Sequence, residues 1–154
     1  MDYVTTSKEA MNVVGIAVRT ANMKAMNDIP ALWNRFYNEK ISDKIPHKKN
    51  SDVCGLYIDY EADYTKPYTL VVGCEVSQCE KVPEGMVLKK VPSSKYAVFT
   101  AKGKFPTCLI NTWMKIWQSN LPRAYTGDFE LYKSNFNPQD PNAQVEIFIA
   151  LKPE

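Results

Sequence analysis

Apolar residues recur along the chain in two patterns, as short continuous runs and as positions three or four residues apart. Residues 12–20 (NVVGIAVRT) form a run rich in β-branched side chains, which predicts a strand. Residues 29–40 carry apolar side chains at helical spacing, with Pro30 suited to a first helical turn, and predict an amphipathic helix. The runs at 54–61 (CGLYIDYE) and 68–76 (YTLVVGCEV) predict two strands of a hairpin closed by a proline-containing loop.

The same order of patterns returns in the second half of the chain. Residues 95–103 (KYAVFTAKG) predict a strand, and residues 104–121 predict a second amphipathic helix. Two further strands are predicted at 127–133 (GDFELYK) and 144–152 (QVEIFIALK). Residues 76–94 lie between the halves and are predicted to be a connector.

Residue identities match between the two halves. Ala17 and Trp33 return as Ala97 and Trp113, each 80 positions later (97 − 17 = 80). At the following strand the best match of identities falls 72 positions later (132 − 60 = 72) and aligns Tyr60 with Tyr132. A repeated unit of this length needs both copies to close one core.

The two copies predict an α+β fold. We expect a single domain over residues 1–154, built from a duplicated strand-helix-strand-strand unit (two SHS2-type modules) at about 11–76 and 94–152. Their antiparallel strands would share one sheet covered by two helices. A cleft at the pseudo-two-fold axis between the copies is the expected ligand site.

Composition narrows the classes of partner. The chain has 154 residues, 45% hydrophobic and 23% charged, with a net charge of +2, which is ordinary for a soluble globular protein and too small for a nucleic-acid footprint. The sequence contains neither a signal-peptide pattern nor an apolar run of membrane-spanning length. The four cysteines are not spaced as a disulfide framework or a zinc site, so reduced thiols and a cytoplasmic location are expected.

Familiar catalytic motifs are missing. His47 is the one histidine, it lies in a polar loop, and a surface position is expected for it. The sequence has no nucleophile elbow, P-loop, dinucleotide-binding glycine motif or zincin motif. No cofactor and no metal are therefore predicted.

Glu130 is the most informative polar residue. Strand alternation places Glu130 and Tyr132 on one face and Phe129 on the other, and the offset of 72 aligns Glu130 with Ile58 of the first copy (130 − 58 = 72). If the first face lines the cleft, a carboxylate lies among aromatic rings and suits a cationic, lipophilic ligand. The alternative is that Glu130 faces water on a half-exposed strand.

The two matching tryptophans also allow two interpretations. Trp33 and Trp113 at equivalent helical positions can pack the helices on the sheet as core residues, or they can line the cleft if the helices flank it. The candidate ligand-binding residues are Glu130, Tyr60, Tyr132, Trp33, Trp113 and Phe36.

Several segments together resemble the bacterial GyrI-like superfamily, which includes the effector-binding domains of multidrug-responsive AraC- and MerR-type transcription activators. The resemblance spans about residues 11–151 and is carried most specifically by Lys95–Phe99 with Gly103 and by the Phe129-Glu130-x-Tyr132 motif. It implies the duplicated fold and, in drug-sensing members, a buried glutamate at the position of Glu130 that pairs with cationic, lipophilic compounds.

The resemblance also implies a particular kind of protein. The ten residues before Met11 are too few for a helix-turn-helix, so we expect a stand-alone effector-binding protein of the integron-cassette type without direct DNA binding. The leading expectation is a non-enzymatic binder of a cationic amphipathic small molecule. One alternative is a hydrolase with Glu130 as general base. The other is a topoisomerase inhibitor that contacts gyrase. A protein partner, if there is one, would be gyrase or a transcription regulator.

Overall fold

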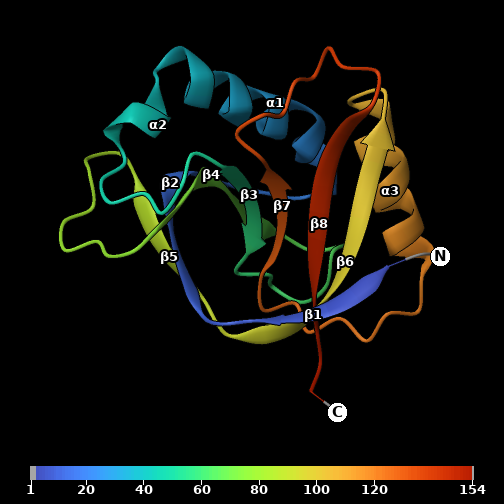
Figure 1. Ribbon diagram of the computed structural model, residues 1–154. Helices are drawn as coiled ribbons and strands as arrows, with labels where there is room; N and C mark the ends of the chain where they lie inside the picture. The colour runs from blue at the N-terminus through green and yellow to red at the C-terminus, as the bar shows by residue number, and fades with distance from the viewer. Residues whose placement is uncertain (1–2, 154) are drawn as a thin grey trace.

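The computed structural model describes residues 3–153, so residues 1, 2 and 154 of the expected domain lie outside it. An eight-stranded antiparallel sheet carries the helices, which confirms the predicted α+β class (Figure 1). The elements are β1 (Val4–Lys8), β2 (Met11–Thr20), α1 (Asn22–Asn38), α2 (Ile41–Lys44), β3 (Val53–Ile58), β4 (Tyr68–Val76), β5 (Val87–Val91), β6 (Ser94–Gly103), α3 (Thr107–Gln118), β7 (Asp128–Tyr132) and β8 (Ala143–Leu151).

Three elements were not expected from the sequence. β1 is exposed throughout, β5 lies inside the expected connector, and α2 is a single turn. The first helix also differs, because α1 begins at Asn22 and contains Pro30 within it. Proline removes one backbone hydrogen bond from a helix, but α1 continues on both sides of it. The additional N-terminal turns of α1 supply several residues to the site described below.

The sheet curls strongly, and its connectivity shows why. The strand order is β1-β6-β8-β7-β3-β4-β2-β5, so β5 forms one edge while β6 is next to the other edge. Only Pro92 and Ser93 separate the end of β5 from the start of β6. Two residues can join these strands only if the two ends of the sheet approach each other, as Figure 1 shows.

The two faces of the curled sheet have different neighbours. The inner face encloses one apolar cluster that draws on both halves and includes Leu56, Phe129 and Phe148. The opposite face, here called the helix face, packs against α1 through Leu32 and Phe36 and against α3 through residues that include Trp113. Each helix therefore covers the sheet half of its own copy.

The structure corrects the alignment of the two copies at the central strands. β3 and β7 start 75 positions apart (128 − 53 = 75), and so do β4 and β8 (143 − 68 = 75). On this alignment the counterpart of Glu130 is Gly55, and the expected counterpart Ile58 is wrong. Ile58 belongs to the inner face, whereas Glu130 lies on the helix face. Matching identities had shifted the strand by three positions, and an odd shift exchanges the faces of a strand.

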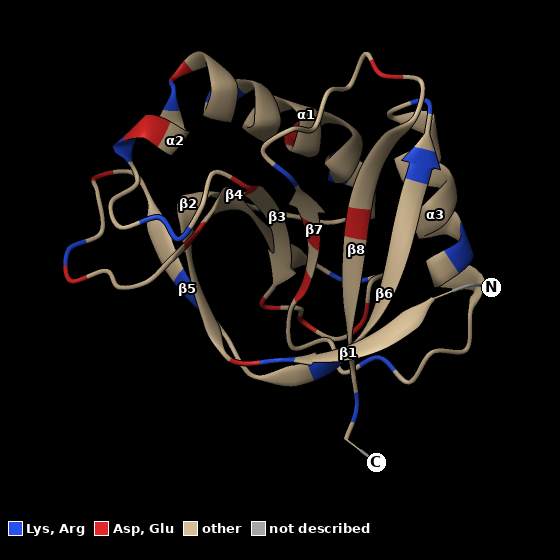
Figure 2. Ribbon diagram, viewed as in Figure 1, with Lys and Arg blue, Asp and Glu red and all other residues tan. Residues whose placement is uncertain are grey.

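Charged side chains are spread over the molecule. In the view of Figure 2, Lys and Arg occupy loops, helix ends and outer strands, while acidic positions occur on β7 and β8 near the middle of the sheet. Within residues 3–153, none of the helices combines the length and the apolar character needed to cross a membrane.

Candidate functional site

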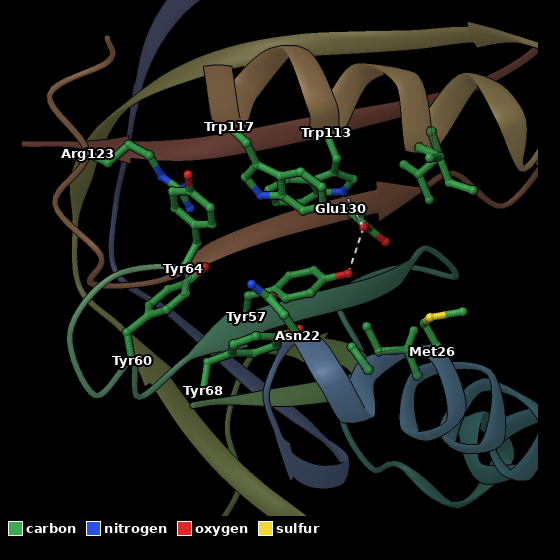
Figure 3. Close-up of a pocket in the computed structure, with 14 residues that line it drawn as sticks. Asn22, Met26, Tyr57, Tyr60, Tyr64, Tyr68, Trp113, Trp117, Arg123 and Glu130 are labelled. Atoms are coloured by element: carbon green, nitrogen blue, oxygen red, sulfur yellow. Dashed lines mark hydrogen bonds between the residues drawn. The ribbon is translucent and has the colours of Figure 1, made fainter. Parts of the chain in front are cut away.

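A cavity of about 480 Å³ opens on the helix face between α1 and α3 (Figure 3). Its floor comes from the central strands β3, β4 and β7, and its two sides come from the helices of the two copies. It therefore lies at the pseudo-two-fold position that the repeat predicts. The residues that line it are Asn22, Ala25, Met26, Ile29, Tyr57, Tyr60, Tyr64, Tyr68, Leu109, Ile110, Trp113, Trp117, Arg123 and Glu130.

Glu130 lies on the floor of the cavity and is only 2% exposed. Its Oε2 accepts hydrogen bonds from the Tyr57 hydroxyl at 2.9 Å and from the Trp113 indole N–H at 2.7 Å. Its Oε1 accepts a third from the Tyr132 hydroxyl at 2.7 Å. These bonds fix the carboxylate in place, and the water-facing alternative for Glu130 does not hold.

The electrostatics of Glu130 reflect two opposing effects. Burial raises the pKa of the Glu130 carboxyl above its usual value, and the three donors from Tyr132, Trp113 and Tyr57 lower it, with burial the larger effect. The described residues 3–153 show no ion pair to Glu130. Desolvation, followed by the neighbouring carboxylate, raises the pKa of the Tyr57 hydroxyl well above its usual value, so this group is a stable donor.

Gly55 makes room for the carboxylate. It lies directly opposite Glu130 in the β3–β7 pair. A β-carbon at Gly55 would be 3.2 Å from Oε1 of Glu130 and 3.2 Å from the Trp33 ring. The first copy thus leaves empty the space that the second copy fills with a carboxylate.

Aromatic rings form most of the wall. Tyr57 packs on Trp113 with ring centroids 5.3 Å apart, and Trp113 packs on Trp117 at 6.2 Å. Tyr64, from the loop between β3 and β4, stacks on Trp117 at 6.0 Å with the rings nearly parallel. Trp117 and Met26 are well exposed, so apolar surface continues from the cavity to its mouth.

A second polar group lies beside Glu130 on the same strand. Asp128 is fully buried and pairs with Arg123, whose Nη2 is 2.7 Å from the Asp128 carboxylate. Asp128 also accepts hydrogen bonds from the Tyr60 hydroxyl at 2.7 Å and from the Ala150 backbone N–H at 2.8 Å. This acidic residue is neutralised by a cation, in contrast to Glu130.

The structure divides the residues predicted for the site into three groups. Glu130, Tyr60 and Trp113 line the cavity. Tyr132 and Trp33 lie behind Glu130, since Tyr132 bonds its carboxylate and Trp33 packs on the Tyr132 ring with centroids 4.9 Å apart. They support the carboxylate without lining the cavity.

Phe36 lies elsewhere. It is 1% exposed and packs in the core between α1 and the first half of the sheet. The helix turn that carries Leu32 and Phe36 faces that sheet half, while the N-terminal turns of α1, with Asn22 and Met26, reach the cavity. The expected place of Phe36 in the aromatic wall is therefore corrected to a place in the core.

Several wall residues were missed from the sequence. Tyr57 was overlooked because the offset of 72 assigned the side chains of its strand to the wrong faces. In the structure Gly55 pairs with Glu130, and Tyr57, two residues further along the same face of β3, reaches the Glu130 carboxylate. Trp117 follows Trp113 by one helical turn, so the helical spacing of the two tryptophans was an available signal. Arg123 and Tyr64 lie in loops, and no pattern in the sequence indicates their direction.

The chemistry available in the cavity is that of one buried carboxylate among aromatic rings, with the Arg123 guanidinium, paired with Asp128, as a second polar group. Within the described part of the chain, no group of three or more His, Cys, Asp or Glu residues is placed to hold a metal ion. The described cysteines Cys54, Cys74, Cys79 and Cys108 are free thiols.

Comparisons with known proteins agree with the fold and with the resemblance. The Cass2 family model, described as integron-associated effector binding protein, matches residues 6–151. The chain is 32% identical to the putative transcriptional regulator protein YobU of Bacillus subtilis over an alignment of 155 residues. This alignment covers 96% of each protein.

Two solved structures share the whole architecture. An integron cassette protein from the mobile metagenome of Vibrio cholerae superposes with a TM-score of 0.75 at 33% identity, covering 97% of this chain and 95% of the other. The SAV2435 protein, solved bound to tetraphenylphosphonium, has a TM-score of 0.82 at 22% identity, with 99% and 94% covered. These matches confirm the duplicated α+β fold that was predicted from the repeat.

Proposed function

Because this chain belongs to the Cass2 family of integron-associated effector binding proteins, we propose that its effector is a cationic, lipophilic small molecule held in the cavity between α1 and α3. Glu130 would supply the counter-charge for the cation. The observation that carries the proposal is a buried carboxylate on the cavity floor with three neutral hydrogen-bond donors and no ion pair among residues 3–153.

The lack of a positive side chain paired with Glu130 within residues 3–153 supports a cation as the ligand. A buried carboxylate without a cation is unfavourable because it has lost its hydration. Nearby Asp128 is also a buried acid, but its charge is balanced within the protein because Arg123 pairs with it directly. Glu130 has no such partner in the described part of the chain, so a ligand that brings a positive charge into the cavity gains a strong interaction there.

The walls support a lipophilic ligand. Rings of Tyr57, Trp113, Trp117 and Tyr68 line the same cavity as the carboxylate, and aromatic faces attract cations as well as burying apolar area. A compact alkylammonium would leave these rings uncovered. The cavity of about 480 Å³ falls within the range of drug-sized sites, ~300–1,000 Å³.

Hydrolysis is the competing use of the same carboxylate. A general base must accept a proton from a water within hydrogen-bond reach. In this cavity both oxygens of Glu130 already accept bonds from Tyr57, Trp113 and Tyr132, and each of these bonds lowers the pKa of the carboxyl and so opposes uptake of a proton. The names of the matching family and of YobU also describe effector binding and transcriptional regulation. We therefore favour binding over turnover.

A pair of ions with the same shape tests the proposal. Tetraphenylphosphonium, the ligand in the SAV2435 structure, and tetraphenylborate differ mainly in the sign of their charge. Calorimetric titration in potassium-free buffer should show saturable 1:1 binding of the phosphonium and much weaker binding of the borate. Equal affinity for the two ions would contradict the role of Glu130, and catalytic consumption of an added ester or epoxide would support the hydrolase.

A further inference from the structure

Arg123 has unused hydrogen-bond donors at one end of the cavity. Its side chain lines the cavity and is about 5% exposed. Nη2 donates to Asp128, but Nε and Nη1 have no hydrogen-bond partner within residues 3–153. Buried donors are almost always paired in folded proteins, so these two require an explanation.

Neighbouring rings do not satisfy these donors. The Arg123 guanidinium lies 4.4 Å from the Tyr125 ring centroid and 5.8 Å from that of Tyr64. Aromatic rings are weak acceptors, whereas the guanidinium N–H groups make full hydrogen bonds to oxygen acceptors. Figure 3 shows the guanidinium beside the Tyr64 ring, at the end of the cavity away from Met26.

The geometry points to a second subsite, in which Nε and Nη1 of Arg123 donate to an uncharged acceptor oxygen on the ligand. This inference rests on the proposed function, because the same ligand would place its cation at Glu130. Asp128, which pairs with Arg123, and Glu130 lie two residues apart on the same face of β7, with their Cα atoms about 7 Å apart. The preferred ligand is then an aromatic cation that carries a carbonyl, amide or ether oxygen on a short chain.

Charge favours a neutral acceptor over an anion. The Arg123 charge is already balanced by Asp128 at 2.7 Å, and Asp128 is fully buried. Glu130 adds a further negative charge to the same strand face. A ligand carboxylate would be repelled by Glu130 and would find no net positive charge at Arg123. A neutral oxygen pairs with the free donors without that repulsion.

Three triphenylphosphonium probes separate the contributions to binding. One carries a 4-carbamoylbutyl chain, the second carries its hydrocarbon isostere 5-methylhexyl, and the third carries 4-carboxybutyl. Wild-type protein should bind the amide at least fivefold more tightly than the isostere and more tightly than the carboxylate. In Arg123→Lys, which keeps a positive charge beside Asp128 and removes the guanidinium fork, this preference should disappear, so that the amide and its isostere bind with equal affinity.

The outcomes distinguish this inference from the proposed function. No binding of the isostere to wild-type protein would contradict the proposed function itself. Binding of the isostere with no preference for the amide, an unchanged preference in Arg123→Lys, or a preference for the carboxylate would overturn only the Arg123 subsite. If Arg123→Lys does not fold, a crystal structure of wild-type protein with the amide probe decides. The probe's carbonyl oxygen should lie within about 3.2 Å of Nε or Nη1, and any other position of that oxygen overturns the inference.

Discussion

Gly55 lies directly opposite Glu130 in the central strand pair, and the duplication makes the two positions equivalent. The pseudo-two-fold axis thus passes through a pair formed by the smallest residue and a carboxylate. A side chain at Gly55 would meet both Oε1 of Glu130 and the Trp33 ring. The symmetric fold therefore accommodates one buried charge at its axis because one copy carries glycine there.

Replacing that glycine tests this relationship. In Gly55→Ala the added carbon lies 3.2 Å from Oε1 of Glu130 and must displace the carboxylate or Trp33. We expect a loss of about 1–3 kcal/mol in the free energy of unfolding, as for other overpacked cores, and weaker binding of tetraphenylphosphonium. Urea unfolding and calorimetry measure the two effects. Replacing glycine by alanine without a clash usually stabilises a protein slightly, so a stabilised variant with normal affinity would show that the space is not needed.

The pH dependence of binding should follow Glu130. Burial raises the pKa of this carboxyl above its usual value, and only the ionised form attracts a cation. Affinity for tetraphenylphosphonium should therefore fall about tenfold per pH unit once the pH drops below that pKa, and binding near it should release a proton. The phosphonium charge does not titrate, so the dependence reports on the protein. An affinity that stays constant between pH 8 and pH 4 would contradict this assignment.

The same pKa sets the sign of the effect on stability without ligand. Because the folded-state pKa of Glu130 lies above the unfolded value, the unfolded chain ionises first as the pH rises. The contribution of Glu130 to stability is therefore greatest at low pH and declines as the pH rises from the usual carboxyl range through the raised pKa. Comparing wild type with Glu130→Gln across this range in urea isolates the contribution, and a difference that grows in favour of wild type with rising pH would contradict it.

Tyr57 should tune the midpoint of this titration. Its hydroxyl donates to Oε2 of Glu130, so Tyr57→Phe removes one of the bonds that stabilise the ionised form. The pKa of Glu130 should rise further, and the pH midpoint for phosphonium binding should move up with it. Tyr68→Phe is the matched control, because Tyr68 also lines the cavity but is not one of the three donors. Equal midpoints in the two variants would show that Tyr57 does not act through Glu130.

Wall and core positions should separate in their responses to mutation. Trp117 is 42% exposed at the mouth of the cavity, whereas Phe36 is 1% exposed in the core. Trp117→Ala should lower phosphonium affinity roughly tenfold through lost aromatic contact, with a change in unfolding free energy below about 1 kcal/mol. Phe36→Leu should lower the unfolding free energy by about 1–2 kcal/mol and leave affinity unchanged. Thermal unfolding and titration of both variants check the pair, and the reverse result would place Phe36 in the site.

Local patterns in the sequence were sufficient for most of the fold. The run at 68–76 coincides with β4, and the repeat of Trp33 as Trp113 predicted two equivalent helices on one shared sheet. Alternation along 127–133 placed Glu130 and Tyr132 on one face, and the two side chains are hydrogen-bonded. Such features depend on neighbours in the chain, which a sequence displays directly.

Features that depend on distant contacts were not predictable in the same way. The register between the copies is set by pairing of β3 with β7, and matching identities missed it by three positions. The segment before Pro30 is helical although its sequence gives only a weak signal for a helix. The inward direction of Arg123 depends on its buried ion pair with Asp128. These positions complete the cavity. The sequence thus indicated Glu130 and Trp113 as candidates but not the residues that Arg123 and the first turns of α1 add to the cavity lining.

The measurement that tests the central claim most directly is titration of Glu130→Gln with tetraphenylphosphonium and tetraphenylborate. Glutamine keeps the shape of the side chain: its carbonyl can accept from Tyr57 and Trp113, while its amide donates to the Tyr132 oxygen, so the bond to Tyr132 reverses direction. The loss of the charge is then the main change. We predict a 30- to 100-fold loss of phosphonium affinity, about 2–3 kcal/mol, with borate binding unchanged or improved and the fold intact. A Glu130→Gln protein that binds the phosphonium as tightly as wild type would contradict the account.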